Sequence, residues 1–390
     1  MPHTPPTVWC PGRRHRVKLD PKRFWARAAC PVCRTPVDPA RTQRLLITGR
    51  MLLPGKRWAP ANSLSWALLA LVCLVAGMIN LVGDRHWLGT ALLFSGRWIW
   101  LVPVGGWLLL LIAWRPRPLA PALFPTITAL AVVLFGVMDL HLGWRRLIPA
   151  GGGQRIRVLT FNTAASPLAG QRLALMLQQW HPDIAAFQEC SRALRQELGL
   201  LTQWHTDTTV GCLASRFPID SIARMPSEHL RVVEGAGIVT TYHLATPAGP
   251  IAFTSVHLET ARHGLERLLT DGVEGSDAVR DNMTLRDLES EQARRWVDRS
   301  QDPKIIVGDF NMPVESAVYR DHWGDLSNAW HRAGRGLGHT KYTGWILLRI
   351  DHVLTDRSWR AVTATTGPAY GSDHWPVIVD LVRQERGGGR

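Results

Sequence analysis

The chain has 390 residues, an apolar content that is ordinary for a globular protein, and a formal net charge of +14. The length allows more than one folding unit, and six cysteines are too few to indicate a disulfide framework. A basic chain invites a nucleic-acid partner, but the excess charge is confined to one part. Residues 1–153 contain 19 Lys and Arg against four acidic residues, whereas residues 154–390 contain 26 against 27.

Residues 1–63 form a basic, proline-rich segment with 13 Lys and Arg and two acidic residues. A basic segment directly before an apolar one is more typical of a topology signal than of a nucleic-acid site, although the second interpretation stays open. The first ~30 residues lack the apolar core of a secretory signal peptide. We therefore expect this segment to stay on the cytoplasmic side of a membrane.

The same segment contains candidate zinc ligands at Cys10, His15, Cys30 and Cys33. Cys30 and Cys33 form an intact Cys-x2-Cys knuckle, which supplies two ligands for Zn²⁺ from one tight turn. The first knuckle lacks its second cysteine, and His15 is the only nearby substitute. The pattern indicates either a small zinc ribbon or a segment that has lost the site.

Three apolar stretches follow, at residues 64–82, 99–114 and 119–140. At 1.5 Å per residue such helices are long enough to cross about 30 Å of hydrocarbon. Tryptophan, which prefers the membrane–water interface, lies near several of their ends, at Trp66, Trp98, Trp100, Trp114 and Trp144. No amphipathic helices lie between them to make a buried soluble core, so we expect about three transmembrane helices within residues 64–144.

The distribution of basic residues predicts the orientation of these helices. The N-terminal segment is expected in the cytoplasm, together with Arg115 and Arg117 between the second and third stretches. Three crossings then place the rest of the chain outside the cytoplasm, although Arg145 and Arg146 on that flank weigh against this. The prediction is a multi-pass membrane protein with an extracytoplasmic C-terminal domain.

Residues 145–153 are predicted to be a Gly-rich linker, residues 154–384 a soluble domain and residues 385–390 a tail. In the soluble domain short apolar runs, as at 156–161, 184–187 and 305–307, alternate with helical stretches at 173–180 and 285–297. Strands this apolar are covered by other layers on one or both faces. The pattern therefore predicts an α/β sandwich.

Polar residues of one kind stand at or near the ends of these apolar runs: carboxylates, amides and imidazoles. They are Asn162, Glu189, His257, Asp309, Asn311, Asp351, His352, Asp373 and His374. Ligand sites of layered folds gather at strand ends along one sheet edge. Hard oxygen ligands favour Mg²⁺ or Mn²⁺ over zinc, and an Asp–His pair can orient and polarise an imidazole.

In this order the motifs resemble the endonuclease/exonuclease/phosphatase superfamily, the fold of DNase I-like nucleases, inositol-polyphosphate phosphatases and sphingomyelinases. The blocks are FN, QE, SRFP, SVHL, GDFN, RIDHV and SDHWPV, spread over about 230 residues. GDFN and SDHWPV at this separation, with QE upstream, are together specific. The resemblance implies a four-layer α/β sandwich that hydrolyses phosphoesters with Mg²⁺ or Mn²⁺.

The resemblance also implies a role for each residue. Glu189 would hold the metal, with Asn162 beside it positioning metal or phosphate and Asp373 contributing a further ligand. His374 would be the base or electrostatic partner for attack by water, with Asp351 fixing its tautomer. Asp309 would serve the leaving oxygen or orient the water. Asn311 and His257 would hold phosphate oxygens, whereas His352 would be structural.

One departure from the family pattern bears on the substrate. Several nucleases of the family have an Asp two residues after the Asn, where this chain has Ala164, which disfavours a specialised abasic-site repair enzyme. A nucleic acid and a lipid headgroup both stay open as the phosphoester, and no specific protein partner is predicted. The alternative function is a catalytically silent membrane adaptor that uses the N-terminal ribbon as an interaction module.

Overall fold

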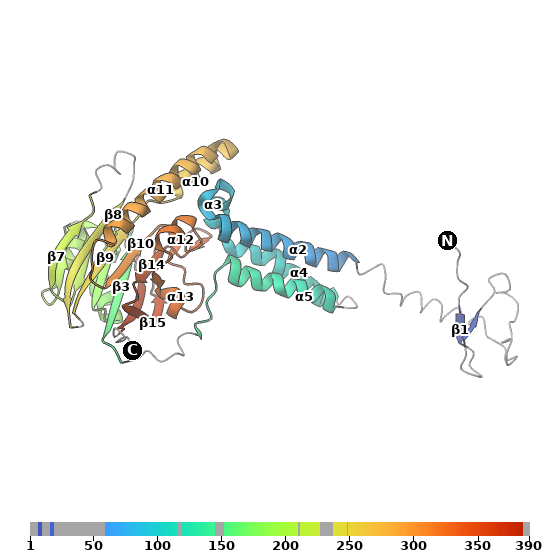
Figure 1. Ribbon diagram of the computed structural model, residues 1–390, viewed down its shortest axis with the longest axis horizontal. Helices are drawn as coiled ribbons and strands as arrows, with labels where there is room; N and C mark the ends of the chain where they lie inside the picture. The colour runs from blue at the N-terminus through green and yellow to red at the C-terminus, as the bar shows by residue number, and fades with distance from the viewer. Residues whose placement is uncertain are drawn as a thin grey trace.

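The computed structural model describes residues 7–9, 16–18, 59–114, 119–144, 152–209, 211–226, 237–247 and 249–384. Within these residues an apolar helical bundle precedes an α/β domain (Figure 1). Near the N-terminus the strands β1 (Thr7–Trp9) and β2 (Arg16–Lys18) pair antiparallel. The candidate zinc ligands Cys10, His15, Cys30 and Cys33 lie outside the described residues, as do residues 145–151 and the tail.

Three helices of the bundle are long and apolar enough to cross a membrane, at Pro60–Arg85, Arg97–Trp114 and Ala120–Val137. They coincide with the three apolar stretches of the sequence. The elements are α2 (Ala59–Gly77), η2 (Met78–Val82), η3 (Gly83–Arg85), α3 (Trp87–Leu93), η4 (Arg97–Trp100), α4 (Leu101–Trp114), α5 (Ala120–Ala131) and η5 (Val132–Val137).

Small and polar residues join these helices inside the bundle. The indole of Trp107 donates to Ser65 Oγ at 2.8 Å, and the hydroxyl of Thr126 donates to the same atom at 3.2 Å. Large apolar side chains such as Leu74 and Leu109 instead project outward and are exposed. An apolar exterior with hydrogen-bonded polar residues inside is the arrangement that a lipid environment favours.

The α/β domain contains two mixed six-stranded sheets. One has the order β11-β14-β10-β9-β8-β7, with β7 (Ile219–Arg224), β8 (Ile238–Thr246), β9 (Gly249–His257), β10 (Lys304–Asp309), β11 (Ser327–Asn328) and β14 (Asp351–Thr355). The other has the order β15-β16-β3-β4-β6-β5, with β3 (Arg155–Asn162), β4 (Ile184–Gln188), β5 (His205–Asp207), β6 (Cys212–Ser215), β15 (Trp359–Thr366) and β16 (Val377–Arg383). A two-stranded hairpin joins β12 (Lys341–Thr343) to β13 (Ile346–Leu348).

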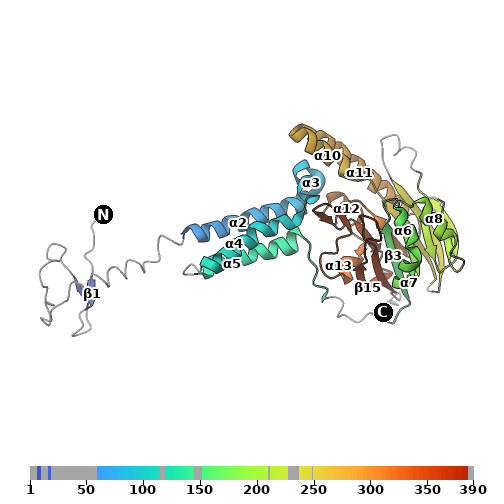
Figure 2. The same ribbon diagram turned by 180° about the vertical axis from the view of Figure 1, so that it is seen from behind.

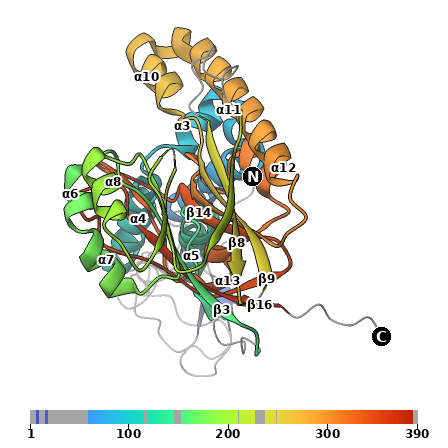
Figure 3. The same cartoon turned by 90° about the vertical axis from the view of Figure 1, so that its left-hand side faces the viewer.

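Helices cover the outer faces of both sheets, which confirms the predicted α/β sandwich (Figure 3). On one side lie α6 (Pro167–Gln171), α7 (Leu173–Trp180) and α8 (Arg192–Gly199). On the other lie α11 (Ser276–Val297) and α12 (Ala317–Trp323); α10 (Arg262–Asp271), η7 (Gly272–Gly275) and α13 (Ala329–Ala333) complete the domain.

The core follows from alternation along the strands, because successive side chains of a strand point to opposite faces. In β4, Ile184 and Ala186 pack between the sheets, whereas Ala185 and Phe187 pack under α7 and α8. In β10, Ile305 and Val307 point between the sheets and Ile306 toward the helices of the other side. Both sheets are therefore buried on two faces, and their edges are left to carry polar chemistry.

Candidate active site

Most of the predicted site residues meet at one edge of the sandwich, because the central strands end there together. In one sheet β10 runs parallel to β9 and antiparallel to β14, so that Asp309 stands opposite His257 on one side and Asp351 on the other. In the other sheet β3 and β4 are parallel and end at Asn162 and Gln188. The carboxyl ends of parallel strands are where ligand sites form in such folds.

Glycine makes this register possible at the end of β10. Gly308 has a φ of +133°, and a Cβ there would lie 2.0 Å from the carbonyl oxygen of Val256. Only glycine accepts this backbone conformation and this close approach. The glycine of the GDFN motif therefore lets β10 place Asp309 beside β9.

His374, Asp351 and Asp309 form a buried group at the centre of the edge. Nδ1 of His374 lies 2.9 Å from Oδ2 of Asp351, and Nε2 lies 3.7 Å from Oδ2 of Asp309. Burial lowers the pKa of His374, but the charges of Asp351 and Asp309 outweigh it and raise the pKa to about 9. The imidazole is thus protonated at neutral pH in this arrangement.

Asp309 connects the two sheets. Its Oδ2 accepts a hydrogen bond from the Asn162 amide at 2.8 Å and lies 3.9 Å from Nε2 of His257, while its Oδ1 accepts from the backbone of Asn311 at 2.8 Å. Burial raises the pKa of Asp309, and the neighbouring carboxylate of Asp351 raises it further. The site therefore concentrates negative charge in a buried place.

Glu189 brings the third carboxylate to the mouth of the site. Its Oε1 accepts from the Asn162 amide at 3.0 Å and lies 3.5 Å from Nε2 of His257, and its side chain is 39% exposed. Its backbone φ is +49°, in the left-handed region that is uncommon for residues other than glycine. Two hydrogen bonds hold this turn, from the Thr163 hydroxyl and the Ala165 amide to the carbonyl oxygen of Glu189.

A comparison with protein families shows which family has this set of motifs. The model of the Endonuclease/Exonuclease/phosphatase family matches residues 159–374, which is more than half of the chain. The match contains the predicted motif blocks from FN to RIDHV and ends at His374, inside the SDHWPV block. The chain belongs to this family. Membership supports phosphoester hydrolysis in general, and members of the family typically depend on a divalent metal.

Several solved structures are similar to part of this chain at low sequence identity. TDP2 of D. rerio, humanised by 14 mutations, is 13% identical over 58% of this chain and 98% of that chain, with a TM-score of 0.46. A family member from Bacteroides thetaiotaomicron is 16% identical over 60% and 100%, with a TM-score of 0.42. A mannosyl-6-phosphatase of the same organism is 18% identical over 58% and 99%, with a TM-score of 0.39. The comparison with curated proteins found no match.

The donor set of this family member fits a divalent cation. The carboxylates of Glu189, Asp309 and Asp351 surround the site, and Oδ1 of Asp351 is buried without a hydrogen-bond partner among the described residues. Carboxylate oxygens of Asp309 and Asp351 lie within 4.8 Å of each other, beside the imidazole of His374. A hard cation such as Mg²⁺ or Mn²⁺ would offset the crowded negative charge.

A cavity of about 310 Å³ opens beside Glu189 and His257 and offers room for a substrate group. Arg195, Ser255 and Thr240 also line it. It lies at the edge where β4 and β9 end, and Glu189 is the one of the three carboxylates that lines it. A phosphoester placed there would reach both Glu189 and His257.

Two predicted ligands have other partners in this structure. Asp373 lies 4.0 Å from Nε2 of His374, but its carboxylate is half-exposed and pairs with the Lys341 ammonium at 2.5 Å. The side-chain amide of Asn311 donates to the carbonyl oxygen of Leu258 at 2.7 Å. The structure therefore places both residues at the rim of the site and outside the carboxylate cluster.

His352 is buried and its Nε2 lies 2.9 Å from the carbonyl oxygen of Met312. Burial lowers its pKa to about 3, so it is neutral at physiological pH. These contacts agree with the structural role expected for it. They support the loop that follows Asp309.

Several supporting residues carried no clear signal in the sequence. The Ser372 hydroxyl donates to the carbonyl oxygen of Asn162 at 2.8 Å and accepts from the His374 amide at 3.0 Å. The Thr340 hydroxyl accepts from the amide of Asp351 at 3.0 Å. Only Ser372 belongs to a motif block; Thr340 and Lys341 lie in an unremarkable polar segment.

The cysteines of the catalytic domain correct one expectation. Six cysteines were too few to indicate a disulfide framework, yet Cys190 forms a disulfide with Cys212. The bond lies directly after Glu189 and joins the end of β4 to β6. The two residues are 22 positions apart, a spacing that carries no recognisable pattern.

A second group of candidate metal ligands, Asp139, His141 and His331, lies between the helices and the catalytic domain. Arg349 donates hydrogen bonds to Asp139 and to His331 there. Burial raises the pKa of Asp139, but Arg349 outweighs it and holds the pKa well below its usual range. A guanidinium cation already neutralises this carboxylate, so the catalytic edge is the better metal site.

Proposed function

We propose that the chain is a membrane-anchored, Mg²⁺- or Mn²⁺-dependent phosphoester hydrolase that activates water for attack on phosphorus. The observation that carries this proposal is the meeting of Glu189, Asp309, Asp351 and His374 at one sheet edge, beside an open cavity. The silent-adaptor alternative predicts an incomplete carboxylate set. The complete set therefore favours the hydrolase.

Glu189 would hold the metal, with Asn162 positioned by its two carboxylate contacts. When bound, the cation would neutralise charge on a phosphate oxygen and favour ionisation of water. Asp351 fixes the orientation of His374 and holds the proton on its Nδ1. The protonated imidazole would stabilise charge on the phosphate, and it would act as a base only after losing its proton.

Asp309 and His257 complete the proposed machinery. Asp309 Oδ2 lies between Asn162, His257 and His374, where it can orient an attacking water or serve the leaving oxygen. His257 lines the cavity and lies near Glu189, in a position to hold a phosphate oxygen. Asn311 and Asp373 are proposed to contact substrate or metal from the rim.

We further propose that the N-terminus is cytoplasmic and the catalytic domain extracytoplasmic. Three crossings would put the two ends of the chain on opposite sides, and the basic N-terminal segment favours the inside. The disulfide between Cys190 and Cys212 supports the outer location. Disulfides persist in oxidising compartments and are rare in the cytoplasm.

The proposal is tested with the purified full chain in detergent or nanodiscs, because the helices share a core with the catalytic domain. The panel holds plasmid DNA, single-stranded DNA, RNA, sphingomyelin, phosphoinositides and a chromogenic diester, with and without Mg²⁺ or Mn²⁺. We expect metal-dependent hydrolysis that His374→Ala lowers by about 100-fold or more. Silence across the panel would favour the adaptor, whereas full activity of His374→Ala would contradict the role assigned to His374.

A further inference from the structure

The candidate spans are fastened to the catalytic domain by buried charged pairs. Arg97, at the start of the second span, donates to both carboxylate oxygens of Glu315, at 2.7 and 3.2 Å. Asp84, near the end of the first span, pairs with Arg286 of α11 at 3.0 Å, and both side chains are fully buried. Asp84 also accepts from Ser316 and Ala317 at the start of α12.

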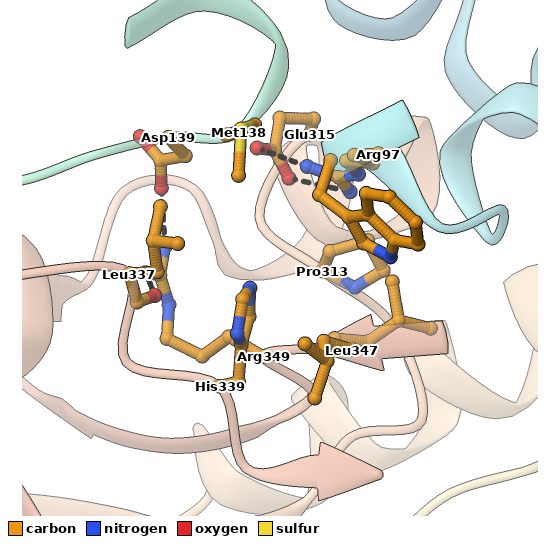
Figure 4. Close-up of a pocket in the computed structure, with 11 residues that line it drawn as sticks. Arg97, Met138, Asp139, Pro313, Glu315, Leu337, His339, Leu347 and Arg349 are labelled. Atoms are coloured by element: carbon orange, nitrogen blue, oxygen red, sulfur yellow. Dashed lines mark hydrogen bonds and ion pairs between the residues drawn. The ribbon is translucent and has the colours of Figure 1, made fainter. Parts of the chain in front are cut away.

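Apolar packing continues across the same interface. Val137 and Met138 from the end of the third span belong to one buried cluster with Phe310 and Met312, which flank the catalytic Asp309 loop. Figure 4 shows the interface lined by Arg97 and Met138 from the helices and by Glu315 and Arg349 from the domain, and only about 20 Å³ of space is left within it. Interfaces packed this closely resist rigid-body motion, so the helices hold the domain in one position.

This position brings the catalytic centre close to the ends of the spans. Glu315 follows Asp309 by six residues, and even a fully extended chain of that length reaches only about 20 Å. A second connection runs through the β12–β13 hairpin. Lys341 at its start pairs with Asp373, and Trp345 at its turn accepts a hydrogen bond from the Trp98 indole at 2.8 Å.

The α10–α11 hairpin adds an apolar tip on the same side. In Figures 1 and 2 it extends from the catalytic domain past α3, toward the side on which the spans lie. Leu269 and Val273, near its turn, are 86% and 68% exposed. α11 contacts α3 and η3, so the helix that carries the tip also packs at the interface between helices and domain. Exposed apolar side chains on the side of the domain that faces the spans would fit the headgroup region of a bilayer.

We propose that the catalytic centre takes its substrate from the bilayer surface, as a phosphoester in a lipid headgroup, with the α10–α11 tip seated among the headgroups. This inference rests on the proposed function and names its substrate class. Tethering raises the effective concentration of a lipid substrate, whereas the near-neutral charge of residues 154–390 gives nucleic acid little electrostatic attraction.

The first test compares hydrolysis of a vesicle-borne and a soluble substrate by the full chain. The vesicles contain phosphatidylcholine, phosphatidylglycerol and sphingomyelin, and the soluble probes are a chromogenic diester and single-stranded DNA. We expect headgroup release to fall about fivefold in Leu269→Glu/Val273→Glu, because charge at the tip opposes its insertion, with the rate on the soluble diester unchanged. Leu200→Glu, an exposed leucine after α8 on the far side of the domain, is the matched control.

Equal headgroup release by the tip variant and the wild type would overturn the inference, as would turnover of DNA without any release of headgroups. Equal loss on the soluble diester would also overturn it, because the tip would then act on catalysis and not on access to the bilayer. No hydrolysis of any probe by the wild type would instead contradict the proposed function. A second readout is independent of catalysis: a photoreactive benzophenone side chain at position 269 should crosslink to lipid in nanodiscs, whereas one at position 200 should not. Absence of a lipid adduct at position 269 would refute the seating of the tip.

Discussion

At the scale of single residues, the site depends on how His374 is held. Its imidazole lies between Asp351 and Asp309, and these two charges keep it protonated against the effect of burial. The types of these residues and their place at strand ends were predictable from the motifs. The residues that support them were not predictable. Thr340 accepts a hydrogen bond from the Asp351 amide and Lys341 pairs with Asp373, and no local sequence pattern marks either contact.

Asp351→Asn is expected to lower hydrolysis by about 100-fold or more, because the imidazole loses both its orientation and its charge partner. The pKa of His374 should fall from about 9, because burial then acts with less opposition. The measurement is the pH–rate profile on the soluble diester. Asp302→Asn is the control, since it removes another Asp–His pair, with His243, away from the site; equal losses in both variants would contradict the assigned role.

Glu289 gives a prediction on stability. Burial raises its pKa to about 7 from 4.5, while its carboxylate accepts from the Glu259 amide. Because the folded state disfavours the ionised form of Glu289, the stability that the protonated side chain contributes is fully present below pH 4.5. This contribution is lost as the pH rises through about 7. Glu289→Gln should therefore stabilise the protein at pH 8, by on the order of 3 kcal/mol, and have little effect at pH 4.

Thermal unfolding of the purified chain at both pH values measures this difference. Glu291→Gln is the matched control, because Glu291 lies on the same helix and pairs with the exposed Arg295 at the surface. A gain from Glu289→Gln that is the same at pH 4 and pH 8 would show that ionisation of Glu289 is not the cause.

At the scale of elements, apolar strands and spans were predictable because their residues repeat in a simple way. α11 was predicted only over its second half, at residues 285–297, and begins at Ser276. It buries the polar side chains of Arg286, Glu289 and Ser290, so its inner face does not follow an apolar period. Strand order and the pairing of Cys190 with Cys212 likewise arise from long-range contacts.

The pair of Arg97 and Glu315 should be sensitive to loss of one partner. Arg97→Met leaves the Glu315 carboxylate buried without its cation, and such changes cost about 3–5 kcal/mol. Arg97→Met/Glu315→Met should recover most of the loss in the thermal midpoint. Arg85→Met, which breaks the exposed pair with Asp321, should cost less than about 1 kcal/mol; an equal effect of both single variants would contradict the buried role.

The Cys190–Cys212 disulfide leads to two predictions, one on thermal stability and one on the redox state of the compartment that holds the catalytic domain. Closing a loop of this length contributes about 3 kcal/mol, so Cys190→Ser/Cys212→Ser should lower the thermal midpoint, whereas Cys73→Ser should not. Free thiols are alkylated in intact cells before the protein is purified. Peptide mapping should then find Cys190 and Cys212 joined by a disulfide. Free thiols at both positions would argue against an oxidising environment.

At the scale of the whole molecule, the sequence predicted the apolar helices and the catalytic domain as separate parts. In the structure the two parts pack against each other. The described ends of the three spans share a buried cluster with the loop after Asp309, and two charged pairs cross the same interface. This docking was not predictable, because Asp84 and Arg97 are isolated charges in apolar surroundings. It makes the three apolar helices part of the catalytic domain's stability and fixes where the site lies relative to them.

The most direct test is a Mg²⁺ titration of chromogenic diester hydrolysis by the full chain, comparing wild type with Glu189→Gln. Glu197→Gln, on the exposed side of α8, is the matched control. We predict a saturable dependence on Mg²⁺ in the wild type and control, and at least about tenfold more Mg²⁺ for half-maximal rate in Glu189→Gln, because loss of a ligand charge worth about 1.4 kcal/mol has that effect. A rate independent of metal, or identical titrations for all three proteins, would contradict a metal-dependent hydrolase centred on Glu189.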